Sequence, residues 1–344
     1  MKERVPSPWT EARLEELRLE AQRAGRVAGT GVRPPGAPFP VATPETGYYG
    51  LPPLKAPTWT WEVPVYFFLG GAAGASAVIA AAARASGAPR RLVSQARWVA
   101  AAGAALSPPL LIADLGRPER FLNMLRVFKP QSAMSMGAWT LVAFSTAAGA
   151  AAFADALDRA LGGSVPVRVV ADAAGTLAAA TGVVMATYTG VLVGATAIPA
   201  WSENATRLPI HFAASGLASA VGILQLLGAD HPALNRLGIG AAAVETAIGW
   251  ELERRARRSL DPLKVGMSGA IVRAGGVLSG PVTLLLRALG GKRRRWRSAA
   301  AWSALAGSLL TRIGWVAAGY DSSRDPIPPL EAEGDLRPPK GKAR

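Results

Sequence analysis

Long apolar stretches, separated by short basic segments, dominate this chain between residues 63 and 319. A helix needs about 20 mostly apolar residues to cross a bilayer. Eight stretches approach that length: residues 63–84, 92–113, 135–154, 168–198, 208–228, 233–252, 268–289 and 299–319. The pattern predicts an all-α, polytopic membrane protein with about eight transmembrane helices in a bundle, and it excludes a soluble globular enzyme.

Three of the expected spans are less regular than the others. The fourth is long, so we expect it to be tilted, or broken near Gly190–Gly194. The sixth contains Arg236 and Glu245, and the seventh contains Arg273 and Pro281. For these last two, a less regular helical hairpin is an alternative to two plain spans.

Both ends of the chain are polar. The expected organisation is an N-terminal arm at residues 1–60, a membrane domain of eight helices at 61–320 and a polar tail at 321–344. Residues 10–26 have the pattern of a short amphipathic helix. The arm is either a solvated surface segment or a strap that binds a partner subunit. An even number of spans places both tails on one side of the membrane.

The formal net charge of +15 does not indicate nucleic-acid binding here. The basic residues lie between the apolar stretches, in clusters such as Arg254–Arg258 and Lys292–Arg295. That distribution is typical of loops that face anionic lipid and the cytoplasm. We therefore expect membrane lipid, and no nucleic acid, as the partner of these charges.

Redox centres held by this chain are restricted by its composition. It contains no cysteine, so it cannot bind an iron–sulfur cluster through thiolates. Its two histidines, His211 and His231, bracket the fifth span and are about 30 Å apart along a helix. They cannot ligate one haem together. We expect no metal site, and electrons must come from another subunit.

Ionisable side chains at membrane depth cost about 2.5–3.5 kcal/mol each to insert, so each indicates a possible function. If both tails share a side, the ends of several spans bring one set of polar side chains to that surface: Glu62, Tyr66, Asp114, Tyr188 and His211. A quinone head group needs hydrogen-bond or proton donors near its two oxygens and an apolar cleft for its tail. The alternative is that these side chains only anchor helix ends in the lipid head groups.

Several segments resemble the NrfD/polysulfide reductase family of membrane anchor subunits. The most specific is the D-L-G-R-P motif within LSPPLLIADLGRPERFLNMLRVFKPQSAMSMGAW (106–139). The others are WTWEVPVYFFLGGAAGASA (59–77), TYTGVLVGATAIPAW (187–201), RLPIHFAASGLASA (207–220) and LLTRIGWVAAGYDSSRDP (309–326). The resemblance covers about residues 48–326.

The resemblance implies an eight-helix, haem-free subunit of the plasma membrane that exchanges electrons with menaquinone or ubiquinone. Its expected partners are a ferredoxin-like iron–sulfur subunit and, beyond that, a molybdopterin oxidoreductase or a multihaem cytochrome. Any enzyme activity would belong to the complex, because this chain alone has no redox centre.

The resemblance also implies roles for individual residues. Asp114 is expected to hydrogen-bond or protonate one quinone oxygen, and Tyr188 to donate to the other. Some members have His or Asn at the start of the first helix, where this chain offers Glu62 and Tyr66. Three further residues are expected to line the pocket or hold its loop: Tyr66, Arg117 and His211. Arg312 is expected to tie the last helix to the tail.

Two other functions stay open. The chain could be a purely structural membrane anchor without quinone chemistry, or an ion- or proton-translocating, transporter-like subunit in which Asp114 and Glu245 bind ions. An inverted repeat would favour transport, and none is evident. Asp172 and Glu245 are either proton-relay candidates or carboxylates paired with a neighbouring Arg or Ser.

Overall fold

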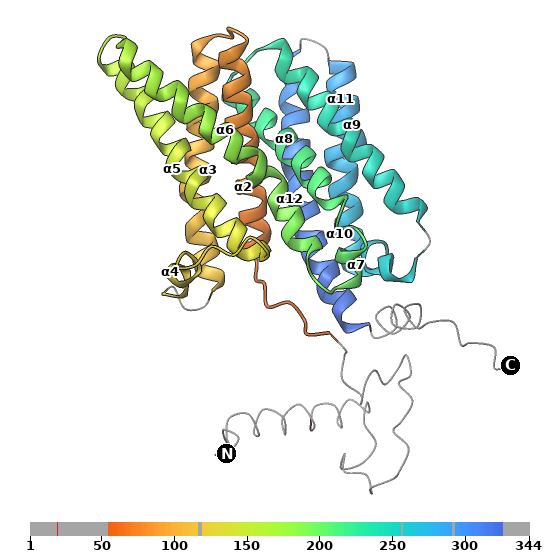
Figure 1. The fold of residues 1–344 in the computed structure, drawn as a ribbon. Helices are drawn as coiled ribbons and strands as arrows, with labels where there is room; N and C mark the ends of the chain where they lie inside the picture. The colour runs from red at the N-terminus through yellow and green to blue at the C-terminus, as the bar shows by residue number, and fades with distance from the viewer. Residues whose placement is uncertain (1–18, 20–53, 116–118, 256, 291–292, 326–344) are drawn as a thin grey trace, which may run out of the picture. The chain divides into compact units, whose positions relative to one another are not determined.

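The structure is a computed structural model that describes Leu19 and residues 54–115, 119–255, 257–290 and 293–325 (Figure 1). The chain divides into two compact units, Met1–Pro57 with Tyr320–Arg344, and Thr58–Gly319. The second unit contains the helices discussed below, except for the last residues of the C-terminal helix. The amphipathic helix expected at residues 10–26 lies outside the described residues, apart from Leu19, and so does Arg117.

All regular elements within the described residues are helical. In chain order they are α2 (Glu62–Ala85), α3 (Arg90–Asp114), α4 (Arg120–Met124), α5 (Ala133–Ala160), α6 (Val165–Gly194), α7 (Pro199–Ser202), α8 (Leu208–Leu226), α9 (Pro232–Arg254), the 3-10 segment η1 (Arg258–Leu263), α10 (Gly266–Val277), the π-helical segment η2 (Leu278–Val282), α11 (Thr283–Gly290) and α12 (Arg294–Arg324).

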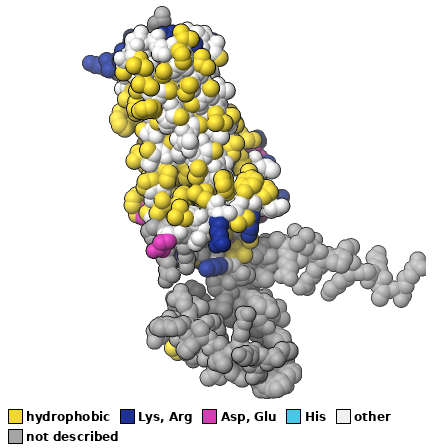
Figure 2. Space-filling model, turned by 60° about the vertical axis from the view of Figure 1, so that its left-hand side comes forward, with side chains coloured by type: hydrophobic (Ala, Val, Ile, Leu, Met, Phe, Trp, Pro, Cys, Tyr) yellow, Lys and Arg dark blue, Asp and Glu magenta, His cyan; other side chains and the backbone are white. Residues whose placement is uncertain are grey.

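Six helical segments in this part of the chain are long and apolar enough to cross a membrane: α2, α3, α5, α6, α8 and the continuous stretch Gly266–Gly290. Helices α9 and α12, with 23 and 31 residues, have sufficient length but a more polar composition. Bulky apolar side chains such as Phe153, Leu177 and Leu285 are more than half exposed. Figure 2 shows a mostly hydrophobic surface along the helices. The prediction of an all-α, multi-pass membrane protein is confirmed.

Helix α2 lies at the centre of the first half of the bundle and packs against α3, α6 and α8 (Figure 1). Small residues permit this close approach, as is common where helices pack within membranes. A methyl group built on Gly74 of α2 would lie 2.4 Å from the carbonyl oxygen of Gly182 in α6. Helix α8 contacts α2 and α6 on one side and α9 on the other, so it joins the two halves.

Helix α6 is not broken near its end, in contrast to one of our expectations. It runs without interruption from Val165 to Gly194. A methyl group on Gly190 would lie 2.4 Å from the carbonyl oxygen of Leu208, at the start of α8. The glycines of this stretch therefore allow α8 to approach α6 closely.

The seventh expected span is irregular at its middle. Pro281 has no N–H to donate, so an α-helical hydrogen bond is missing there, and the helix changes to a π-helical segment over Leu278–Val282. The carbonyl oxygen of Leu278 accepts hydrogen bonds from Thr283 Oγ1, at 2.7 Å, and from Ser303 Oγ, at 2.8 Å. The irregular segment packs against α9.

Candidate functional site

Two carboxylates expected at one membrane surface, Glu62 and Asp114, meet at Thr60. Glu62 begins α2 and Asp114 ends α3, so neighbouring antiparallel helices bring them together. The Thr60 N–H donates to Asp114 Oδ1 at 3.0 Å. Thr60 Oγ1 lies 3.0 Å from the same oxygen and is also within hydrogen-bonding contact of Glu62 Oε2.

The two carboxylates share one hydroxyl group. A threonine hydroxyl carries one hydrogen, so it can donate to only one of the two carboxylates. Glu62 and Asp114 are both partly exposed, so they are accessible from the surface. Carboxylates in such a position can serve as general acids or bases.

Two phenols lie deeper in the same end of the bundle. Tyr66 follows Glu62 by one helical turn on α2 and is 2% exposed, and Tyr188 of α6 is 7% exposed. The ring of Tyr188 occupies a notch in α5 that exists because residue 137 is glycine. The two phenols are close enough to interact electrostatically. Together with the carboxylates they form a polar layer framed by α2, α3, α5 and α6, which we call the carboxylate–phenol layer.

His211 belongs to a different cluster from the one in which we expected it. It is buried at the start of α8, and its Nδ1 lies 3.8 Å from Glu245 Oε2 of α9. Ser279 of the π-helical segment donates to the same carboxylate oxygen at 2.7 Å. Glu245 Oε1 and His211 Nδ1 have no hydrogen-bond partner. The contacts described for His211 do not include Glu62 or Asp114.

Arg312 is buried within the bundle, and its described contacts are with α8 and with its own helix. Its guanidinium donates to Ser215 Oγ at 2.7 Å, to the Phe212 carbonyl oxygen at 3.2 Å and to the Ser308 hydroxyl at 2.6 Å. It therefore ties α12 to α8 at membrane depth.

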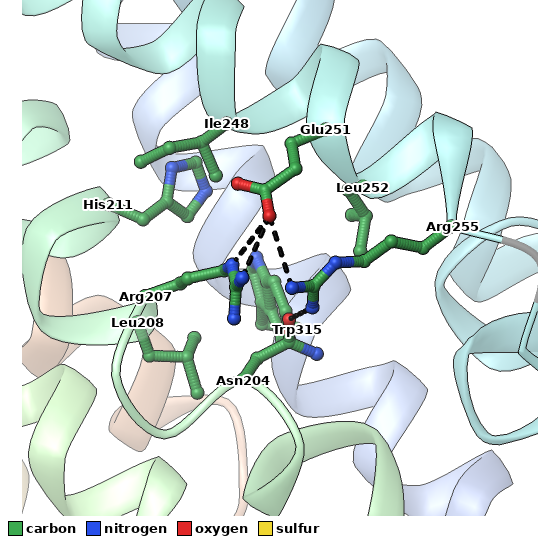
Figure 3. A pocket seen from close by; sticks show the side chains of 9 residues that line it. All are labelled: Asn204, Arg207, Leu208, His211, Ile248, Glu251, Leu252, Arg255 and Trp315. Atoms are coloured by element: carbon green, nitrogen blue, oxygen red, sulfur yellow. Dashed lines mark hydrogen bonds and ion pairs between the residues drawn. The ribbon is translucent and has the colours of Figure 1, made fainter.

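A small cavity next to His211 is enclosed by ion-paired side chains (Figure 3). Glu251 of α9 accepts from Arg207, at 2.8 Å, and from Arg255, at 3.1 Å. The cavity has a volume of about 10 Å³, which is the space of about one water molecule. It is too small for a quinone head group, so His211 is not reached by such a ligand through it.

Asp172, at the opposite end of the bundle, is paired with two arginines. Its carboxylate lies 2.8 Å from Arg84 and 2.7 Å from Arg97. Glu245 is likewise paired with Ser279. The contacts of both residues match the paired alternative for these carboxylates.

Ligands for a redox centre are sparse. Among the residues that the structure describes, no three His, Asp or Glu side chains are grouped so that they could hold a metal ion. His231 caps the start of α9, whereas His211 lies near the start of α8. The two histidines are thus at opposite ends of α8.

Sequence reasoning missed two residues of the carboxylate–phenol layer. Thr60 lies two positions before the start of α2, outside the N-cap position, which is Trp61, and had no distinguishing signal. Gly137 lies among other small residues of α5 and had no distinguishing signal. Only the packing of α5 against α6 shows its role.

Comparison with known proteins gives one family and no individual relative. No curated protein matches the chain. The family model described as polysulphide reductase, NrfD, matches residues 54–229, which is just over half of the chain and includes Thr60, Glu62, Asp114 and Tyr188. The chain therefore belongs to the NrfD polysulphide reductase family.

Proposed function

We propose that this chain is the quinone-reactive membrane subunit of a respiratory oxidoreductase complex. Its family implies a membrane subunit of such complexes. The observation that carries the finer proposal is the pair of carboxylates, Glu62 and Asp114, that share the single hydroxyl of Thr60 at one end of the bundle. Tyr66 and Tyr188 lie in the same layer.

The chemistry requires proton exchange at two oxygens. Oxidation of a quinol breaks two O–H bonds and releases two protons and two electrons. In this proposal Asp114 accepts the proton of one oxygen. The phenol of Tyr188 hydrogen-bonds the other oxygen, whose proton is accepted by Glu62. The protons leave through the exposed carboxylates to water, and the electrons pass to a redox centre in a partner subunit. Reduction of a quinone uses the same groups in the opposite direction.

The partner must carry the electrons because this chain has no cysteine for an iron–sulfur cluster. We propose a ferredoxin-like iron–sulfur subunit that docks at the end of the bundle where Asp114 lies. A molybdopterin or multihaem cytochrome subunit would follow it, in the plasma membrane. Menaquinone and ubiquinone both fit the proposed chemistry.

The test is quinol-linked turnover of the assembled complex with Asp114→Asn. Asparagine keeps an oxygen that can accept from the Thr60 N–H, so the local fold should persist while proton uptake is lost. Turnover should fall on the order of 100-fold, the scale of general acid–base catalysis. Asp230→Asn is the matched control, because Asp230 is an exposed carboxylate in the loop at the other end of α8.

Co-purification of the iron–sulfur subunit must accompany each measurement. Normal turnover of Asp114→Asn in a fully assembled complex would refute the quinone role and leave a structural anchor. Solute uptake by proteoliposomes, independent of a quinol, would instead favour a transporter.

A further inference from the structure

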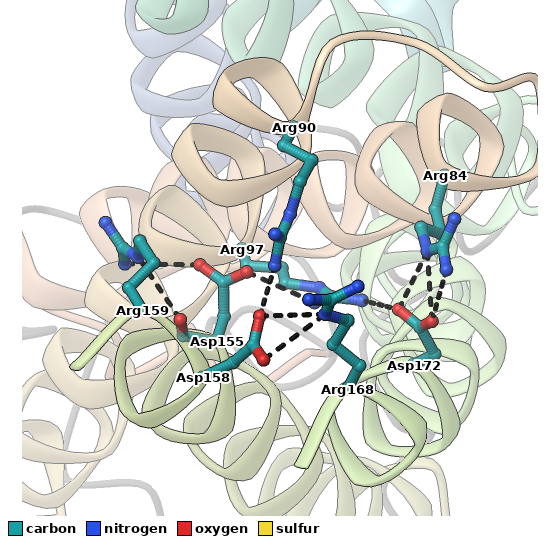
Figure 4. A network of polar contacts seen from close by, with 8 residues as sticks. All are labelled: Arg84, Arg90, Arg97, Asp155, Asp158, Arg159, Arg168 and Asp172. Carbon is teal, nitrogen blue, oxygen red and sulfur yellow. Dashed lines mark hydrogen bonds and ion pairs between the residues drawn. The ribbon is translucent and has the colours of Figure 1, made fainter. Parts of the chain in front are cut away.

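An arginine–aspartate network occupies the end of the bundle opposite the carboxylate–phenol layer (Figure 4). Its eight side chains come from α2, α3, α5 and α6. Arg97, which is buried, lies between two carboxylates: its guanidinium is 3.5 Å from Asp155 and 2.7 Å from Asp172. Asp158 is paired with Arg90 and with Arg168. These pairs hold the ends of four helices together.

The charges at this end do not cancel. The network contains five arginines and three aspartates, and Arg91 adds a sixth arginine next to Arg90. Three positive charges are therefore in excess. The outer members are accessible, because the side chains of Arg90 and Arg159 are 64% and 54% exposed, and Arg91 is exposed as well.

A groove of about 670 Å³ begins at these arginines and follows α3 toward the middle of the bundle. This volume is within the range of about 300–1,000 Å³ that is usual for ligand sites. Residues three or four positions apart share one helix face, and the groove-lining residues Arg91, Gln95, Trp98 and Ala102 follow that spacing. Leu227, at the end of α8, also lines the groove.

The groove is polar at one end and apolar along its length. Its mouth is lined by three arginines and by Asp155, which is paired with one of them, Arg159. The rest of the lining is Ser94, Gln95 and the apolar residues Trp98, Val99, Ala102 and Leu227. The side chain of Gln95 donates through Nε2 to the Leu227 carbonyl oxygen at 3.0 Å, while its Oε1 is buried without a hydrogen-bond partner. The groove thus offers cations at the membrane surface, and a hydrocarbon surface below.

We infer that this groove binds an anionic phospholipid. The excess positive charge complements a phosphate, which arginine can bind through two parallel hydrogen bonds. Basic pockets between transmembrane helices are suited to such head groups. Trp98 is 48% exposed and lies about two helical turns from Arg91 on α3. Tryptophan is a side chain that commonly contacts the membrane interface, and an acyl chain can lie along it. A quinone head group is neutral and would gain little from three arginines.

The test uses the assembled complex, delipidated in a mild neutral detergent. Phosphatidylglycerol and phosphatidylcholine with identical acyl chains are added, and bound lipid is counted by native mass spectrometry. The unaltered complex should prefer phosphatidylglycerol. Arg91→Gln should reduce that preference about fivefold, the effect of one basic residue near the membrane surface. Arg236→Gln is the matched control, because Arg236 is exposed near the same end of the bundle, on α9.

The apolar part of the groove has its own variant. Trp98→Ala should weaken the binding of both lipids while the preference for phosphatidylglycerol persists. The inference would be overturned if Arg91→Gln left the preference unchanged, or if Arg236→Gln lowered it equally. Loss of an acidic partner protein from the Arg91→Gln complex, with lipid binding intact, would also overturn it. None of these outcomes depends on quinone turnover.

Discussion

Replacing Gly137 with alanine should displace the ring of Tyr188. A methyl group built on Gly137 would lie 1.9 Å from Tyr188 Cζ and 2.0 Å from its hydroxyl oxygen, whereas ordinary contacts begin at 3.4 Å. The ring must therefore retreat by about 1.5 Å, and Tyr188 is 7% exposed, so little space is open to it. Overpacking of this kind costs about 1–3 kcal/mol. A misplacement of about 1 Å at a reacting group can lower turnover about 100-fold.

Gly149→Ala is a matched control in the same helix. A methyl group on Gly149 meets no atom within 4 Å, so alanine should be neutral or stabilise α5 by about 0.5–1 kcal/mol. Both variants are compared by thermal unfolding of the purified complex, followed by circular dichroism, and by quinol turnover. If Gly137→Ala unfolds and turns over like Gly149→Ala, the steric role of Gly137 and the placement of Tyr188 are both refuted.

Three further predictions concern charged side chains. Arg97→Gln removes one of two arginine partners from Asp155, which is buried, and from Asp172, which is partly buried. It should lower the free energy of unfolding by about 2 kcal/mol. Arg84→Gln, in a pair that is 56% exposed on the arginine side, should cost less than about 1 kcal/mol; equal losses in thermal unfolding would contradict this. Arg312→Met removes several hydrogen bonds between α12 and α8 and should cost about 3 kcal/mol in the same assay. The hydrogen bond from Arg297 lowers the pKa of Asp230 below its ordinary value of 3.8. Their pair therefore stabilises the fold above about pH 4 and loses that contribution as the pH falls through the lowered value. Arg297→Gln should lower the unfolding midpoint at pH 7, and its effect should shrink as the pH falls below about 4.

The helices were predictable because the bilayer imposes a simple requirement on sequence. Each crossing segment must satisfy its backbone hydrogen bonds internally and present apolar side chains to lipid, so length and hydropathy suffice to find it. The local irregularities of the helices were harder to predict from the sequence. Gly190 was read as a possible break, but a glycine that weakens a helix and a glycine that admits a neighbour look the same in one sequence. Pro281 correctly predicted an irregular helix in this region. It did not predict that the irregular part is a π-helical segment.

The candidate site was partly predictable for a similar reason. Alternating spans place Glu62 and Asp114 at one surface regardless of how the helices rotate. The rotation of each helix about its axis decides the remaining contacts, and it depends on packing between segments far apart in sequence. His211 was therefore assigned to the correct end of α8 but turns toward Glu245. The contacts of Arg312 could not be predicted from the sequence either. Its partners are hydroxyl and carbonyl groups, which are uncharged and so do not stand out as partners for an arginine.

The π-helical segment at Leu278–Val282 has a consequence for changes in chain length. A π-bulge accommodates one residue more than an α-helical turn while the flanking turns keep their faces. Deleting one residue within it should restore a regular helix and leave α10 and α11 in register. The same deletion in the middle of α8 would turn every later residue by about 100° and expose its buried side to lipid. Within the described bundle, this short segment is thus where we expect the chain to tolerate the deletion of one residue. The deletion would remove the hydrogen bond between Ser279 and Glu245.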